Sequence, residues 1–123
     1  TADMVDTTTI RLSLLKIMSH KADQNGAPVY AYMFTYGNSY HGAEIPYVFD
    51  HANASDEEKA LADQISQAWI NFAKTGTPSA EGMPEWEPYT RENGATMILD
   101  TQSELVYHHD QNLLSLLVPD YVY

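Results

Sequence analysis

The stretch Pro28-Val-Tyr-Ala-Tyr-Met-Phe-Thr-Tyr36 is apolar or aromatic at nearly every position. In an extended strand, alternate side chains point to opposite faces, so both faces of this segment are apolar. Such a strand belongs inside a sheet that is covered on both sides, as in α/β proteins. It needs neighbouring strands and a second helical layer, so we expect it to be part of a larger sheet.

The segment before this strand has the pattern of an amphipathic helix. We predict a helix over residues 7–25, capped by Thr7, Thr8 or Thr9 and ended by Asn25-Gly26. Its expected apolar face consists of Ile10, Leu14, Ile17 and Met18.

A second helix is marked by signals at both ends. Ser55 and Glu58 form a capping-box pattern at its start, and Gly76 and Pro78 stop it. Four large side chains recur at helical spacing, and we interpret them as core residues and not as a cofactor site: Leu61, Ile65, Trp69 and Phe72.

Shorter elements complete the predicted organisation. Residues 41–49 are expected to be a loop that runs into a short helical turn, and residues 77–93 a surface loop. Two short strands are predicted at Thr96–Leu99 and Glu104–Tyr107, followed by a helical stretch at Leu113–Leu117. This order predicts an α/β fold with a few sheet strands and packing helices.

The composition narrows the classes of function. The 123 residues contain 17 acidic and 6 basic side chains and no cysteine. A net charge of −11 disfavours nucleic acid and anionic membranes as partners, and no apolar run is long enough to span a bilayer. The lack of cysteine excludes disulfides and thiolate chemistry in this chain, and slightly favours the cytoplasm over export.

His41 is the main candidate for a catalytic side chain. It follows the predicted buried strand, lies on a turn and precedes Gly42, which allows close approach of other backbone. Imidazole suits general base chemistry near neutral pH. Taken from spacing alone, an ordinary loop histidine is the favoured interpretation of His41.

Five segments in order resemble the type-B carboxylesterase family, which includes bacterial para-nitrobenzyl esterases and the cholinesterases. The similarity extends over about residues 26–107 and rests on Gly26–Tyr32, His41–Phe49, Trp69–Pro78, the residues Trp86, Pro88 and Tyr89, and Ala95–Asp100. The resemblance implies an α/β-hydrolase fold, of which residues 1–123 would be a C-terminal segment, incomplete on its own.

The resemblance also implies roles for individual residues. His41 would be the general base of a Ser-His-acid triad that hydrolyses small carboxylic esters. Glu44 and Gly42 would lie behind it, with Glu44 in a hydrogen-bonding role and not as the triad acid. No Gly-x-Ser-x-Gly nucleophile motif or glycine-rich oxyanion loop is present, and Ser39 is interpreted as a turn residue. We therefore expect the remainder of the same esterase to supply the serine, and the chain alone to be inactive.

Other interpretations remain open from the sequence. The chain could belong to a non-catalytic, cholinesterase-like adhesion or binding protein, or could be a small domain that self-associates as a homodimer through residues 28–36. No cofactor is implied. The cluster His108-His109-Asp110 is not interpreted as a metal site, because adjacent strand residues point apart and no third ligand has zinc-type spacing.

Overall fold

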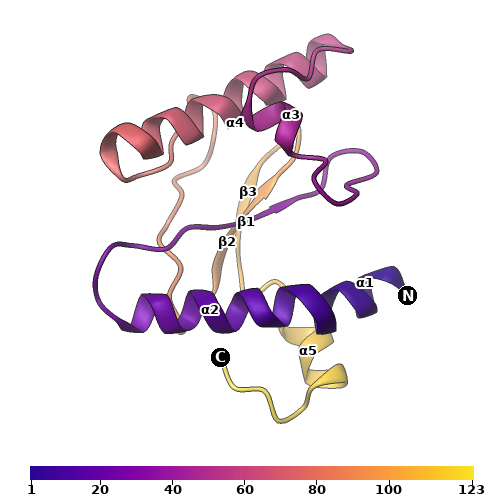
Figure 1. Cartoon of the computed structure of the whole chain (residues 1–123), viewed down its shortest axis with the longest axis vertical. Coiled ribbons are helices and arrows are strands. Elements are labelled where there is room, and N and C mark those ends of the chain that lie inside the picture. Colours follow the sequence, from indigo (N-terminus) through magenta and orange to yellow (C-terminus); the bar gives the residue numbers. More distant parts are fainter. The chain divides into compact units, whose positions relative to one another are not determined.

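The computed structural model describes residues 1–123 except for the side chain of Asp3. Figure 1 shows the helices and strands, which are in chain order α1 (Ala2–Asp6), η1 (Thr7–Arg11), α2 (Leu12–Asp23), β1 (Ala31–Phe34), α3 (Ile45–Val48), α4 (Asp56–Thr75), β2 (Ala95–Leu99), β3 (Glu104–Tyr107) and α5 (Gln111–Leu117).

The chain divides into two compact units. The first unit consists of Thr1–Ala31, Pro88–Thr96 and Val106–Tyr123, and the second of Tyr32–Glu87 and Met97–Leu105. The unit boundaries fall within the strands. The candidate site described below lies in the second unit.

The N-terminal helix starts earlier than the sequence predicts. In Figure 1, α1 and α2 follow one another as a continuous helical run, and the turn between them, η1, is π-helical. The predicted threonine cap is wrong, because the hydroxyls of Thr8 and Thr9 instead donate to the carbonyl of Val5 at 3.2 and 2.6 Å. A threonine hydroxyl that donates to a carbonyl of the preceding helical turn is already hydrogen-bonded within the helix, so it does not cap a helix start.

The apolar face expected for this helix is mostly exposed in this chain. Ile10, Leu14 and Ile17 are at least half exposed, whereas Thr7 and Ser19 are fully buried. Polar partners elsewhere in the first unit select the buried face, since the Ser19 hydroxyl lies 3.2 Å from the hydroxyl of Tyr89. Apolar periodicity finds the most hydrophobic face of a helix, but the hydrogen bonds that orient the helix depend on distant residues.

The strands form one sheet in the order β1-β2-β3. The central strand β2 is buried along its whole length, and β2 and β3 confirm the two short strands predicted from the sequence. The first strand is shorter than the predicted residues 28–36. Pro28 has no N–H to offer a ladder, which is consistent with β1 beginning at Ala31.

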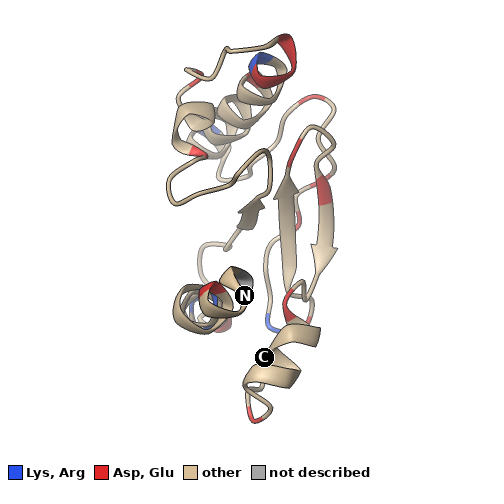
Figure 2. Ribbon diagram, turned by 90° about the vertical axis from the view of Figure 1, so that its right-hand side faces the viewer, with Lys and Arg blue, Asp and Glu red and all other residues tan. Residues whose placement is uncertain are grey.

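Helix α4 forms as its end signals predict. The Ser55 hydroxyl accepts a hydrogen bond from the Glu58 N–H at 3.1 Å, and the Glu58 carboxylate accepts one from the Ala54 N–H at 2.9 Å. Figure 2 shows acidic residues of the first turn in red. Their negative charge interacts favourably with the positive N-terminal end of the helix dipole.

The core face of α4 is narrower than predicted. Leu61 and Ile65 are buried as expected, but Phe72 is 46% exposed, so its assignment to the core is wrong. Two alanines, Ala62 and Ala68, are fully buried instead. Small side chains let the helix approach its neighbours closely, which a pattern of large residues does not reveal. Across the described residues, no helix is both long and apolar enough to cross a membrane.

Candidate functional site

His41 lies on an exposed turn of the second unit, between β1 and α3. Two backbone hydrogen bonds enclose the turn, from the Ala43 N–H to the Tyr40 carbonyl at 2.9 Å and from the Ile45 N–H to the Gly42 carbonyl at 3.2 Å. Gly42 has a φ of +78°, a backbone conformation that is energetically unfavourable for residues with a Cβ. The turn therefore depends on glycine directly after the histidine.

Glu44 connects this turn to the strand before it. The Tyr32 hydroxyl, on β1, donates a hydrogen bond to Glu44 Oε1 at 3.3 Å. Partial burial and the neighbouring Glu44 charge raise the pKa of Tyr32 to about 12. Tyr32 is therefore a neutral donor at physiological pH, and its bond to Glu44 joins the start of α3 to the sheet.

Aromatic packing holds Tyr32 from its other side. The ring of Tyr32 meets Trp69 of α4 edge-on at a centroid distance of 5.2 Å, and Trp69 meets Trp86 at 6.0 Å. A chain of packed rings thus runs from the loop after α4 to the strand that precedes His41. Such edge-to-face pairs favour a fixed ring orientation.

Gly42 and Glu44, two of the residues predicted from the sequence, both lie in the turn that carries His41. Gly42 shapes the turn and Glu44 ties it down, but in the described part of the chain no hydrogen bond joins His41 to Glu44. Tyr32 was not singled out from the sequence. The alternation that places Tyr32, Phe34 and Tyr36 on one side of the strand is the signal that could have identified it.

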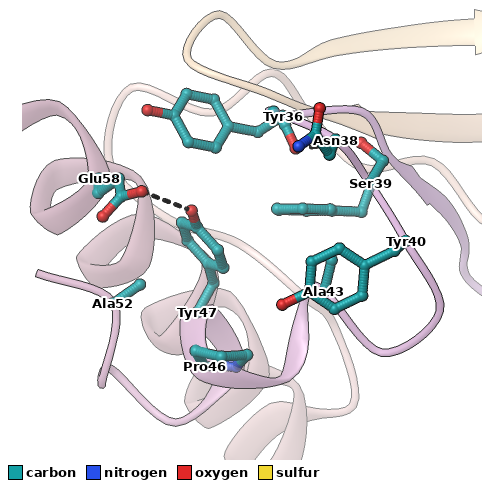
Figure 3. Close-up of a pocket in the computed structure, with 11 residues that line it drawn as sticks. Tyr36, Asn38, Ser39, Tyr40, Ala43, Pro46, Tyr47, Ala52 and Glu58 are labelled. Atoms are coloured by element: carbon teal, nitrogen blue, oxygen red, sulfur yellow. Dashed lines mark hydrogen bonds between the residues drawn. The ribbon is translucent and has the colours of Figure 1, made fainter. Parts of the chain in front are cut away.

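A pocket of about 390 Å³ adjoins the turn, and we call it the tyrosine pocket. Figure 3 shows Tyr36, Tyr40 and Tyr47 around it, with the Tyr47 hydroxyl pointing to Glu58. Tyr40 and Ala43, which flank the His41-Gly42 pair, both line it. Its complete lining is Phe34, Tyr36, Gly37, Asn38, Ser39, Tyr40, Ala43, Pro46, Tyr47, Ala52 and Glu58.

The remaining candidates do not form a second reactive centre. Ser39 lies in a turn as interpreted, and its hydroxyl donates to the Tyr36 carbonyl at 3.0 Å. His109 Nδ1 lies 2.9 Å from Asp110 Oδ1, in the first unit. No group of three potential metal ligands occurs among the residues with described side chains.

The sequence profile of the carboxylesterase family matches residues 1–114. This chain belongs to the carboxylesterase family. It is 37% identical over 105 residues to the para-nitrobenzyl esterase of Bacillus subtilis, a match that covers 72% of this chain and 21% of that protein. It is 36% identical over 95 residues to the liver carboxylesterase of Sus scrofa, covering 63% of this chain and 17% of that protein. The chain therefore spans about a fifth of the length of these relatives.

Solved esterase structures share its architecture. A PNB esterase superposes with a TM-score of 0.67 at 33% identity, covering 73% of this chain and 21% of the esterase. An esterase from the anaerobe Clostridium hathewayi, which can hydrolyse aliphatic aromatic polyesters, superposes with a TM-score of 0.75 at 27% identity, covering 85% and 23%. The predicted family and the prediction of part of an α/β-hydrolase fold are confirmed.

Proposed function

We propose that this carboxylesterase chain supplies His41 as the general base of ester hydrolysis by a Ser-His-acid triad. The observation that carries the proposal is the position of His41. It is exposed on the turn between β1 and α3, within a His-Gly-Ala-Glu segment that resembles the family's histidine motif. Loops that follow the carboxyl ends of strands are where α/β enzymes hold catalytic groups.

The proposed chemistry moves one proton through the His41 ring. As the serine oxygen attacks the ester carbonyl, His41 takes the hydroxyl proton, and it then gives this proton to the departing alkoxide. In the second half, it takes a proton from water, and the serine oxygen leaves with that proton when the acyl enzyme is hydrolysed. The serine, the triad acid and the oxyanion donors would come from the remainder of the same protein.

Glu44 and Gly42 would position the base without touching the ester. Gly42 allows the sharp turn after His41, and Glu44 fixes the following helix through Tyr32. A base held by a rigid turn needs less reorganisation as the reaction proceeds. This is the sense in which the two residues support the proposed catalysis.

The N-terminal helix has an exposed apolar side, which favours the remainder of the esterase as the partner of this chain. Val5, Ile10, Leu14 and Ile17 form a set of apolar side chains that are each at least 50% exposed. Large apolar side chains that recur on the exposed side of a helix favour a surface covered by other protein. If the chain instead associated with itself, light scattering would give twice its mass of 13.8 kDa.

A replacement of His41 in the complete esterase tests the proposal. In His41→Gln, turnover of a chromogenic short-chain ester should fall on the order of 10⁵- to 10⁶-fold, because the base is lost. His51→Gln, a change at another exposed histidine, is the matched control and should leave turnover unchanged. Turnover of His41→Gln within about tenfold of the parent would contradict the proposal.

The 123-residue chain by itself provides the second arm of this experiment. Without a nucleophile, it should show no inhibitor-sensitive turnover of the same ester. Hydrolysis by the isolated chain that is blocked by a serine-directed inhibitor would exclude the proposed division of the triad. A non-catalytic, cholinesterase-like binding protein would instead lack serine at the nucleophile position of the complete chain, and its turnover would not respond to His41→Gln.

A further inference from the structure

The dipeptide Asn-Gly occurs at two places in the chain, Asn25-Gly26 and Asn93-Gly94. In such a pair the backbone nitrogen of the glycine can attack the side-chain amide of the asparagine, because no Cβ on the glycine stands in the way. The attack needs an accessible asparagine side chain, a glycine N–H without a hydrogen bond, and enough backbone freedom to bring the two atoms together. The two pairs differ in all three respects.

The pair Asn93-Gly94 is held in place by hydrogen bonds. Asn93 Oδ1 accepts hydrogen bonds from the N–H groups of Thr90 and Ala95, both at 2.9 Å. Its Nδ2 donates to the Pro88 carbonyl at 3.1 Å. The Gly94 N–H donates to the Thr90 carbonyl at 2.9 Å, and Gly94 is buried. Both the nitrogen that would attack and the amide that it would attack are therefore hydrogen-bonded.

The pair Asn25-Gly26 is exposed, just beyond the end of α2. In the part of the chain that the structure describes, the Asn25 side chain makes one hydrogen bond, from Nδ2 to the Asp23 carbonyl at 3.3 Å, and the Gly26 N–H makes none. The backbone of this turn is held by the Asn25 N–H, which donates to the Ala22 carbonyl at 3.1 Å. Few interactions therefore oppose a local opening of the turn.

Lys21 places a positive charge beside the exposed pair. Its Nζ donates to the Ala27 carbonyl at 3.2 Å, and a Cβ at Gly26 would lie 3.8 Å from the same Nζ. A nearby cation favours loss of the proton from the Gly26 amide and stabilises the negative charge that develops as its nitrogen attacks. The surroundings of Gly26 thus favour the reaction that those of Gly94 oppose.

We propose that Asn25 is a site of spontaneous deamidation. The Gly26 nitrogen forms a bond to Asn25 Cγ and gives its proton to water, the Cγ–Nδ2 bond breaks, and the amide nitrogen leaves as ammonia with a proton taken from water. Water then opens the cyclic imide at either carbonyl, which gives aspartate or, with the main chain routed through Cγ, isoaspartate. Each product adds one negative charge beyond α2, and the reaction does not involve His41.

Prolonged incubation of the complete esterase at mildly alkaline pH tests the proposal. Trypsin cuts between the two pairs, after Lys59, Lys74 and Arg91, so the pairs fall on different peptides. Tandem mass spectrometry measures the conversion of each asparagine against a sample taken at the start. Asn25 should deamidate at least about tenfold faster than Asn93, because the hydrogen bonds of Asn93 must open first. A ratio near one, or no product at Asn25, would overturn the proposal.

Unfolding in urea separates the effect of the fold from that of the dipeptide. Both pairs lose their native hydrogen bonds there, so Asn25 and Asn93 should react at rates within about threefold of each other. If Asn25 kept its full advantage in urea, the local sequence would set the difference, and the protection inferred for Asn93 would be wrong.

A variant at Gly26 tests the attacking atom. The φ of Gly26 is not positive, and a Cβ there would make only an ordinary contact with Lys21, so Gly26→Ala should fold normally. This variant should slow deamidation of Asn25 at least about fivefold, because the Cβ obstructs the approach of the nitrogen. The rate at Asn93 is the internal control and should match that of the parent. An unchanged rate at Asn25 would show that the Gly26 nitrogen does not attack, and the proposal would be wrong.

Discussion

At the scale of single residues, one hydrogen bond links the strand β1 to the turn that carries His41. The Tyr32 hydroxyl donates it to Glu44 across 3.3 Å, and the Tyr32 ring is held by Trp69. The strand pattern placed Tyr32 in the sheet. It could not identify Glu44 as the partner, because that pairing depends on how residues 37–44 turn back toward the strand.

Removal of this hydroxyl should cost a modest amount of stability. In Tyr32→Phe the ring contact with Trp69 remains, and the free energy of unfolding should fall by about 0.5–1 kcal/mol, as for one partly exposed hydrogen bond. Urea unfolding measures the change. Glu44→Gln retains a carbonyl acceptor for Tyr32 and should lose less. A larger loss in Glu44→Gln than in Tyr32→Phe would show that the carboxylate has another stabilising role.

At the scale of elements, the π-helical turn η1 gives the N-terminal helix its attachment in the first unit. Arg11, at the end of η1, donates from Nε to Asp110 and from Nη1 to Asp6, both at 3.0 Å. The extra residue in a π turn rotates the side chains that follow it relative to a regular helix.

The junction between the start of β2 and the end of β3 leaves no room for a side chain at Gly94. A Cβ there would lie 2.5 Å from His108 Nδ1 and 2.8 Å from the His108 backbone nitrogen, and the φ of Gly94 is +56°. Gly94→Ala should therefore both clash with His108 and strain the backbone.

The matched control for this clash is Gly37→Ala. Gly37 also has a positive φ, of +63°, but a Cβ there would meet nothing within 4 Å. We expect Gly37→Ala to cost about 1–2 kcal/mol from the backbone alone. Gly94→Ala should cost at least about 1 kcal/mol more, measured by thermal or urea unfolding. Equal costs would mean that His108 moves aside freely.

At the scale of the whole molecule, the excess of acid shapes the response to pH. The chain has 17 acidic and 6 basic residues, and Asp110 is a buried carboxylate among them, 7% exposed. Burial alone would raise the pKa of Asp110, but the hydrogen bond from His109 and the charge of Arg11 outweigh it and lower the pKa. The folded state therefore prefers the ionised form more strongly than the unfolded state does.

This shift predicts a loss of stability in acid. A carboxylate with a lowered folded pKa stabilises the fold above its unfolded pKa of about 4, and that contribution disappears as the pH falls through the folded value. Urea unfolding at pH 7 and pH 3 should show a greater loss in the parent than in Asp110→Asn, which cannot ionise. The same pH dependence in both would exclude Asp110 as a source of the acid sensitivity.

Features that depend on neighbours in the chain could be predicted from the amino-acid sequence. Local hydrogen bonding, alternation and backbone freedom account for four of them: the Ser55 cap, the strands β2 and β3, the turn at Ser39, and the exposed loop that carries His41. The order of the motifs likewise determined the family. These signals lie within a few residues of one another, so the sequence displays them directly.

Which surfaces are buried and which side chains meet became known from the three-dimensional fold. It exposed Ile10 and Phe72, buried Ser19 against Tyr89, and gathered the rings of the tyrosine pocket beside Glu58. Burial and pairing are set by residues distant in sequence, and their free energies compete with local hydrophobic preference. That competition has no signature within a single segment.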